Sequence, residues 1–219
     1  MPRKIYVVRH CERIDNIDSK WRKKYPGFMD DNSPLSDRGR KIQGPELCKR
    51  FANVKLDHVI SSPMDRTIET ASLLLGDKDI PIKAEPGLCE VLYLCNDPPS
   101  FWKTEKLIEK FPKVDKNYSP IFNKLPSETG YGDEACIPRV KKLIEQLLKR
   151  YDNPDEQILL VSHGAPIGAI HEVLNGRWKY VGQATVSIWE ETDDGSEKFK
   201  CLSSSDSSHL SDKSNLRPW

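Results

Sequence analysis

Short apolar runs alternate along this chain with longer segments that carry helical periodicity. Strands are predicted where apolar residues cluster in short runs: 5–8, 57–61, 80–84, 158–162 and 184–190. Helices are predicted in four of the segments between these runs: 36–51, 65–75, 134–151 and 166–174. Because strands and helices alternate in this way in α/β sandwiches, we expect that class of fold here.

The two helices in the first half of the chain have recognisable end signals. Ser36 stands where an N-cap is expected, and Gly76 follows the last apolar position of the second helix. Gly44 and Pro45 lie inside the first helix. Because proline lacks a backbone N–H and clashes with the preceding turn, we predict a kink or an early break there.

Two segments depart from the alternating pattern. Residues 91–133 are irregular and rich in proline, lysine and aromatic residues, and an insertion of this length is more often a functional lid than a simple connection. From Ser203 onward the chain is rich in serine and aspartate, so we expect 203–219 to be a flexible tail. The chain length of 219 residues suits a single domain, which we place at 1–202.

Composition restricts the expected partners and location. Acidic and basic residues nearly cancel, to a formal net charge of +1, which argues against nucleic acid or an anionic membrane surface as a partner. No apolar run approaches the roughly 18 residues of a membrane span, and the first residues lack the apolar core of a signal peptide, so we expect a cytoplasmic protein. The six cysteines are scattered without a Cys-x2-Cys pair, which predicts reduced thiols and no metal site.

Three predicted strands end in residues suited to binding an anion. The first strand ends at Arg9 and His10, and the fourth ends at His163. The second runs into Ser61-Ser62-Pro63, with Arg66 close behind. Because the carboxyl ends of parallel strands meet at one edge of a sheet, we expect these side chains to lie together. The sequence therefore predicts a phosphate site built from two histidines and two arginines.

The residue types at this edge match the chemistry of a phosphate monoester. A dianion needs several fixed cations, and the planar fork of arginine is well suited to its oxygens, a role that fits Arg9 and Arg66. A neutral imidazole is a competent nucleophile toward phosphorus, so His10 is the candidate for a covalent intermediate, with His163 on the opposite side of the transferring group. Glu90 follows a predicted strand and is the candidate general acid and, later, base.

Five motifs, in their order and spacing, resemble those of the histidine phosphatase superfamily over residues 5–175. They are Arg9-His10 after a strand, Pro34-Leu35-Ser36 with Gly39, Ser61-Ser62-Pro63-x-x-Arg66, Glu85-Pro86-Gly87-Leu88-x-Glu90 and Val161-Ser162-His163-Gly164. The resemblance implies a phosphoglycerate-mutase-like fold, a three-layer α/β/α sandwich with a mostly parallel central sheet. It also implies an acid-type phosphatase that hydrolyses phosphomonoesters through a phosphohistidine, without a cofactor or a metal.

The same resemblance implies a role for each candidate residue. His10 would be the nucleophile and Glu90 the proton donor. The phosphate pocket would be formed by four basic residues: Arg9, Arg13, Arg66 and His163. Arg13 also has Asp15 within reach, so a solvated ion pair is an alternative for it. The run 9–15 is more similar to the suppressor-of-T-cell-receptor-signalling phosphatases than to the mutases of the superfamily.

One position departs from the family pattern, because Cys11 stands where the family has the glycine of Arg-His-Gly. A β-carbon there is expected to crowd the pocket or to strain the turn. A catalytically weak or inactive relative that binds a phosphorylated ligand or protein is therefore one alternative, and a phosphoglycerate mutase is another. The expected partner is a phosphorylated small molecule or a phosphoprotein substrate, and exposed edge strands of such a sheet can support a homodimer.

Overall fold

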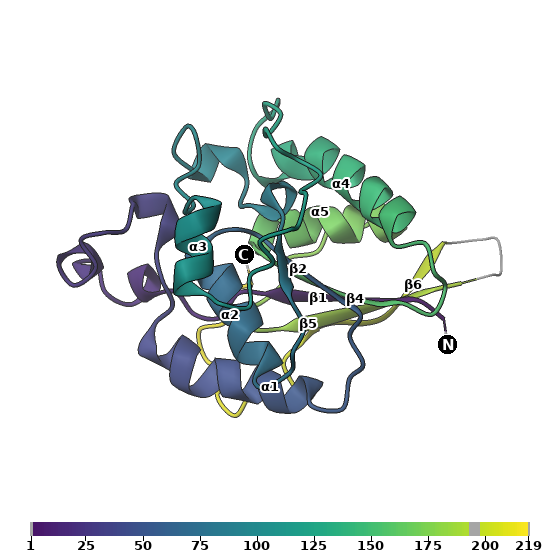
Figure 1. The fold of residues 1–219 in the computed structure, drawn as a ribbon, viewed down its shortest axis with the longest axis horizontal. Helices are drawn as coiled ribbons and strands as arrows, with labels where there is room; N and C mark the ends of the chain where they lie inside the picture. Colours follow the sequence, from purple (N-terminus) through teal and green to yellow (C-terminus); the bar gives the residue numbers. More distant parts are fainter. Residues whose placement is uncertain (1, 193–197, 219) are drawn as a thin grey trace.

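The computed structural model describes residues 2–192 and 198–218. A six-stranded sheet forms its middle layer, in the order β3-β2-β4-β1-β5-β6 (Figure 1). The strands are β1 (Lys4–Arg9), β2 (His58–Ser61), β3 (Ile82–Ala84), β4 (Gln157–Ser162), β5 (Val186–Glu191) and β6 (Phe199–Asp206). The first four strands run parallel, whereas β5 is antiparallel to β1 and β6 is antiparallel to β5. The prediction of a mostly parallel central sheet is confirmed.

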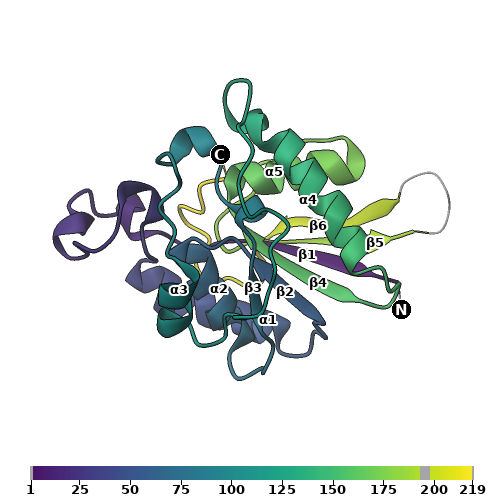
Figure 2. The same ribbon diagram turned by 45° about the horizontal axis from the view of Figure 1, so that its top comes forward.

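Helices cover both faces of this sheet, which confirms the three-layer sandwich (Figure 2). On one face lie α1 (Gly44–Phe51) and α2 (Asp65–Leu75), and on the other lie α4 (Ile137–Arg150) and α5 (Gly164–Asn175). Side chains of β1 alternate between the two cores, because successive residues of a strand point to opposite faces. Ile5 belongs to the core under α4 and α5, whereas Tyr6 belongs to the core under α1 and α2. Within the described residues, no helix is both long and apolar enough to cross a membrane.

The helix expected over 36–51 differs from its prediction at the proline. Ser36 caps the helix as expected, because its Oγ accepts a hydrogen bond from the Gly39 N–H at 3.0 Å. The predicted break is absent, since a π-helical turn, Gly39–Gln43, continues directly into α1. This turn puts Pro45 in the first turn of α1, where a missing N–H disrupts fewer helical hydrogen bonds.

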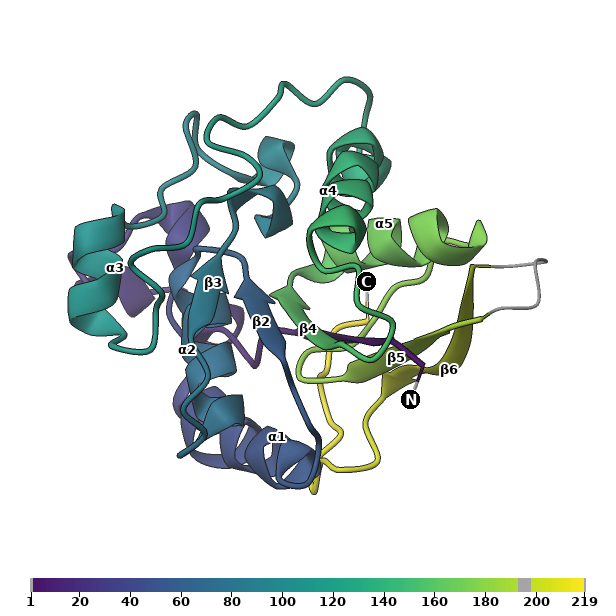
Figure 3. The ribbon, with the colours of Figure 1, turned by 45° about the vertical axis from the view of Figure 1, so that its right-hand side comes forward.

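The insertion at 91–133 is packed onto the body of the protein. It contains the short helix α3 (Thr104–Lys110), which stands beside α2 (Figure 3). Asp65 at the start of α2 accepts a hydrogen bond from the Trp102 indole N–H at 3.0 Å and pairs with Lys110. Further along, Glu85 accepts hydrogen bonds from the Tyr118 hydroxyl at 2.8 Å and from the Ile121 N–H at 2.6 Å. The insertion is thus fixed at two places, and its role as a lid stays a prediction.

The C-terminal segment is ordered where a flexible tail was expected. Residues 203–206 form the second half of β6, and the Ser205 N–H donates to Ser187 Oγ at 3.0 Å. Beyond the strand, Leu210 is buried in the core under α1 and α2. The prediction was wrong for these residues because an edge strand is held by backbone hydrogen bonds, which a serine-rich sequence makes as well as an apolar one. The boundary predicted at residue 202 therefore falls inside a strand.

Candidate active site

The carboxyl ends of β1, β2 and β4 bring the two predicted histidines together. The His10 N–H donates to the Ser162 carbonyl at 3.0 Å, and the Ser62 N–H donates to the Val161 carbonyl at 3.0 Å. These hydrogen bonds continue the backbone pairing of the sheet beyond the strand ends. The residues that follow neighbouring strands therefore stay in register with one another. The imidazole rings of His10 and His163 lie with their centroids 5.3 Å apart.

The imidazole of His10 has a defined tautomer. Its Nδ1 lies 2.7 Å from the carbonyl oxygen of Cys11, and because a carbonyl only accepts, Nδ1 carries the proton. The Nε2 atom is buried and has no hydrogen-bond partner among the described residues. Burial, and then the charges of Arg66 and Arg9, hold the pKa of His10 well below its ordinary value. A neutral ring with a free lone pair on Nε2 is the result.

His163 lies between a serine and a carboxylate. Its Nε2 is 2.8 Å from Ser62 Oγ, and its Nδ1 is 3.8 Å from Glu90 Oε2. Burial and the nearby Arg66 charge hold the pKa of His163 well below its ordinary value as well. The Glu90 side chain is almost buried, and its Oε1 accepts the Val91 N–H at 3.1 Å.

Arg9 and Arg66 have buried guanidinium groups, each with an N–H donor that lacks a hydrogen-bond partner among the described residues. Arg9 Nη1 donates to the Val181 carbonyl at 2.6 Å, and Arg66 Nη1 donates to the Asp31 carbonyl at 2.9 Å. The Nε atom of each is buried without a partner among the described residues. Burial lowers the pKa of each arginine to about 10, so both remain cationic at neutral pH. A β-carbon at Gly164 would lie 3.3 Å from Arg9 Cζ, so the absence of a side chain at Gly164 leaves space for that guanidinium.

Arg13 forms the ion pair with Asp15 that was the alternative to a phosphate role for it. Its Nε donates to Asp15 Oδ1 at 2.8 Å, and a second contact joins Nη2 to Asp15 Oδ2. Although burial by itself lowers the pKa of Arg13, hydrogen bonding and charge from Asp15 outweigh it and leave that pKa above the ordinary value. Arg13 also borders the cavity at the strand ends.

A cavity of about 220 Å³ opens at this edge of the sheet. It is lined by residues from six segments of the chain: Arg9, Arg13, Asn16, Glu90, Leu94, Asp133, Gly164, Ala165, Gln183 and Arg217. The structure thus brings all six sequence-predicted residues into one region. Arg9, Arg13 and Glu90 line the cavity. His163 Nδ1 lies 3.8 Å from Glu90 Oε2, and His10 and Arg66 lie close enough to the lining residues for their charges to act on them. In the part of the chain that the structure describes, no group of three or more His, Cys, Asp and Glu side chains is arranged to hold a metal ion.

The loop after β1 is held by residues of the Pro34-Leu35-Ser36 motif. The Glu12 carboxylate accepts the Ser36 hydroxyl at 2.7 Å and Arg38 Nη1 at 2.9 Å. A β-carbon at Gly39 would lie 2.6 Å from the Glu12 carbonyl oxygen, closer than van der Waals contact allows. The motif therefore positions the His10 loop.

Sequence reasoning missed the residue that fixes the loop carrying Glu90. Arg139 in α4 donates to the carbonyl oxygens of Gly87 at 2.6 Å, Cys89 at 3.0 Å and Glu90 at 3.2 Å. Its charge is balanced by the buried Glu128 carboxylate at 2.7 Å. Arg139 belongs to no motif near the site, and the amphipathic pattern of its helix gave no signal for this contact.

Cys11 does not crowd the site, contrary to the expectation from the missing family glycine. Its side chain is fully buried in the core under α1 and α2, and it does not border the cavity. Its backbone φ is not among the positive values of the described residues, so a β-carbon costs no strain here. Burial raises the pKa of the Cys11 thiol to about 12, which keeps it protonated.

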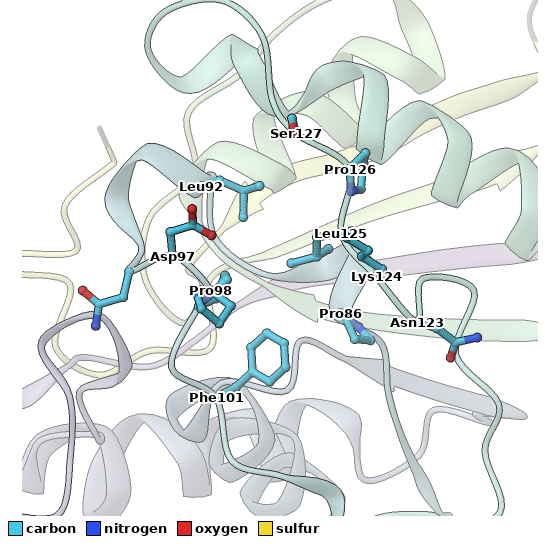
Figure 4. Close-up of a pocket in the computed structure, with 12 residues that line it drawn as sticks. Pro86, Leu92, Asp97, Pro98, Phe101, Asn123, Lys124, Leu125, Pro126 and Ser127 are labelled. Atoms are coloured by element: carbon cyan, nitrogen blue, oxygen red, sulfur yellow. The ribbon is translucent and has the colours of Figure 1, made fainter.

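A second and larger cavity, of about 570 Å³, lies within the insertion (Figure 4). Phe101, Pro98 and Leu125 face it from two stretches of the insertion, and Pro86 borders it from the segment after β3. None of the six sequence-predicted site residues lines this cavity, whereas Arg9, Arg13 and Glu90 line the smaller one.

The chain is similar in sequence to known phosphatases. Phosphoserine phosphatase 1 of Hydrogenobacter thermophilus is 28% identical over 178 residues, which is 79% of this chain and 76% of that protein. The ecdysteroid-phosphate phosphatase of Drosophila melanogaster is 29% identical over 209 residues, covering 80% of this chain and only 27% of that longer protein.

Solved structures show the same fold. The ecdysone phosphate phosphatase from Bombix mori, solved with tungstate, superposes with a TM-score of 0.65 at 19% identity and covers 93% of each chain. The alpha-ribazole-5'-P phosphatase structure from Escherichia coli has a TM-score of 0.62 at 21% identity, covering 94% of this chain and 98% of that one. Residues 5–198 match the family described as histidine phosphatase superfamily (branch 1), and the chain therefore belongs to that superfamily.

Proposed function

We propose that this protein hydrolyses phosphomonoesters by transferring the phosphoryl group to His10. The observation that carries the proposal is the environment of its Nε2 atom, a buried lone pair without a partner in a neutral ring surrounded by arginines. Such a nitrogen is a nucleophile at neutral pH, and the arginines supply charge for the dianion that it attacks.

The first step uses the side chains as follows. Arg9, Arg13, Arg66 and His163 hold the phosphate oxygens while Nε2 of His10 forms a bond to phosphorus and the bond to the leaving oxygen breaks. The leaving oxygen takes a proton from the protonated Glu90 carboxyl group. Glu90 borders the cavity and its Oε2 lies 3.8 Å from His163, which supports this assignment.

The second step returns the enzyme to its starting state. The Glu90 carboxylate takes a proton from a water molecule, whose oxygen attacks phosphorus as the bond to Nε2 breaks. Inorganic phosphate leaves, and Glu90 is again protonated. No redox partner enters either step.

The size of the cavity supports a small substrate. A volume of about 220 Å³ lined by polar and charged side chains suits a small hydrophilic phosphoester better than a large apolar one. The relatives include phosphatases named for phosphoserine and for ecdysteroid phosphates, so phosphorylated small molecules are the class that we favour over phosphoproteins. The buried, inert position of Cys11 removes the reason for expecting an inactive relative.

The test is hydrolysis of p-nitrophenyl phosphate by the native chain and by matched histidine variants. We expect His10→Ala to lose at least about a thousandfold in kcat, because the covalent route is lost. His58→Ala is the control, since His58 lies at the amino end of β2 and pairs with Glu156. A native chain without activity, or a His10→Ala variant with native activity, contradicts the proposal. Alkaline quenching during turnover should trap phosphate on His10.

Three finer expectations belong to the same proposal. The run 9–15 supports a relationship to the suppressor-of-T-cell-receptor-signalling phosphatases within the superfamily. A cytoplasmic location stays a prediction from composition. A homodimer is supported by β6, which has one neighbour among the described strands and so offers an open edge. Size-exclusion chromatography with light scattering tests the dimer directly.

A further inference from the structure

The C-terminal strap, residues 207–218, returns from the end of β6 to the phosphate cavity. It passes beside α1, where the Ser211 N–H donates to Glu46 at 3.1 Å (Figures 1 and 3). Arg38 Nη2 then donates to the carbonyl oxygens of Asp212 at 3.1 Å and Ser214 at 2.9 Å. Arg38 is the same residue that holds Glu12, so the strap is attached to the support of the His10 loop.

The strap delivers Arg217 to the cavity wall. The Arg217 carbonyl accepts a hydrogen bond from Arg9 Nη1, and the Leu216 carbonyl accepts one from the Gln183 N–H at 2.6 Å. Arg217 has a φ of +50°, a left-handed conformation that residues other than glycine rarely adopt. Such a conformation persists where surrounding bonds enforce it, and here these two hydrogen bonds do so.

The guanidinium group of Arg217 has capacity left for a ligand. Its Nη2 donates to the Asn16 carbonyl at 3.2 Å, whereas its Nε is buried and has no partner among the described residues. No ion pair joins Arg217 to an acidic side chain of the described residues. Gln183 beside it differs, because its Nε2 donates to Asn16 Oδ1 at 2.7 Å and its unpartnered atom, the buried Oε1, is an acceptor.

The lining of the cavity indicates where the two parts of a bound phosphoester lie. His10, His163 and Arg66 are buried and do not line the cavity, so we place the phosphoryl group beside Arg9 and Glu90, the lining residues that act together with them. The leaving group then occupies the rest of the cavity, whose wall includes Arg217.

We propose that Arg217 binds a carboxylate on the leaving group, so that this protein prefers small organic phosphates that carry a carboxyl group. This inference rests on the proposed phosphatase function and names its substrate class. A guanidinium fork matches a carboxylate in geometry and charge. Asp133 also lines the cavity and repels a carboxylate placed beside it, which leaves the side of Arg217 and Asn16 for that group.

The test uses two substrates that differ only in the carboxyl group, O-phosphoserine and O-phosphoethanolamine. We expect the native protein to prefer O-phosphoserine. Arg217→Gln should lower kcat/KM for O-phosphoserine by about ten- to a hundredfold, mainly through KM, as for the loss of a charge-assisted hydrogen bond, and by less than about threefold for O-phosphoethanolamine. Arg217→Lys should recover part of the loss, because it restores the charge without the fork.

Lys213→Gln is the matched control, since it removes a charge from an exposed residue of the same strap outside this cavity. It should leave both substrates unchanged. An equal loss on both substrates in Arg217→Gln overturns the proposal, because it would mean a contact to the phosphoryl group or a disturbed fold. A native protein without preference for O-phosphoserine overturns it too. Hydrolysis of p-nitrophenyl phosphate, abolished in His10→Ala, keeps these outcomes separate from a failure of the phosphatase function itself.

Discussion

Lowering the pH should destabilise this protein through the same two histidines that form its site. Both imidazoles are buried, and burial together with the charge of Arg66 keeps their pKa values well below 6.5 in the native state. The unfolded chain binds protons at these rings near pH 6.5, whereas the native protein does not. The free energy of unfolding is therefore highest above that pH and falls as the pH drops below it.

The size of the effect follows from proton linkage. If a ring stays neutral in the native state down to pH 5, the free energy of unfolding falls by about 1.9 kcal/mol per histidine between pH 7 and pH 5. His10 and His163 together should then contribute about 4 kcal/mol. His171, whose pKa burial lowers to about 4, acts in the same direction. A double variant that replaces His10 and His163 but keeps His171 therefore isolates the contribution of His10 and His163.

Urea unfolding at pH 7 and pH 5, in buffers without phosphate or sulfate, measures this contribution for the native chain and for His10→Gln/His163→Gln. The stability lost by the double variant on acidification should be smaller by about 4 kcal/mol. Ile144→Val, a change in the core under α4, should cost about 1 kcal/mol at both pH values and leave the pH dependence unaltered. Equal pH dependence in the double variant and the native chain would refute the reasoning.

Three further predictions concern the loop after β1 and the anion site. Gly39→Ala should cost about 1 to 3 kcal/mol and reduce phosphatase activity, because its β-carbon would meet the Glu12 carbonyl at 2.6 Å; thermal melts and kcat show whether it does. Cys11→Gly should give no gain in activity and lose about 1 to 2 kcal/mol of stability, and a faster enzyme would restore the idea that Cys11 impairs the site. Vanadate at about a hundred times its dissociation constant should add about 2.7 kcal/mol to native stability in calorimetry, and this effect should disappear in Arg66→Ala.

The functional residues that follow the strands could be predicted from the sequence, because their positions depend on local patterns. Apolar runs ending at Arg9 and at His163 specify where strands stop, and the carboxyl ends of parallel strands share one edge. Helix α2 has the bounds that its periodicity and Gly76 predicted. The proline in the first helix was harder to judge, since a π-helical turn can absorb it and no local pattern marks such a turn.

Contacts between distant segments were decided by the tertiary structure alone. Arg139 holds the Glu90 loop from a helix 49 residues further along the chain, and Arg217 reaches the cavity at the end of a serine-rich segment without apolar periodicity. Likewise, the backbone conformation after β1, and not the type of residue at Cys11, decides that its side chain enters the core. The sequence by itself determined which chemical groups stand at the strand ends, because strand periodicity is local. Which further side chains complete the cavity depends on packing and hydrogen bonds between remote parts of the chain, and these leave no local signal.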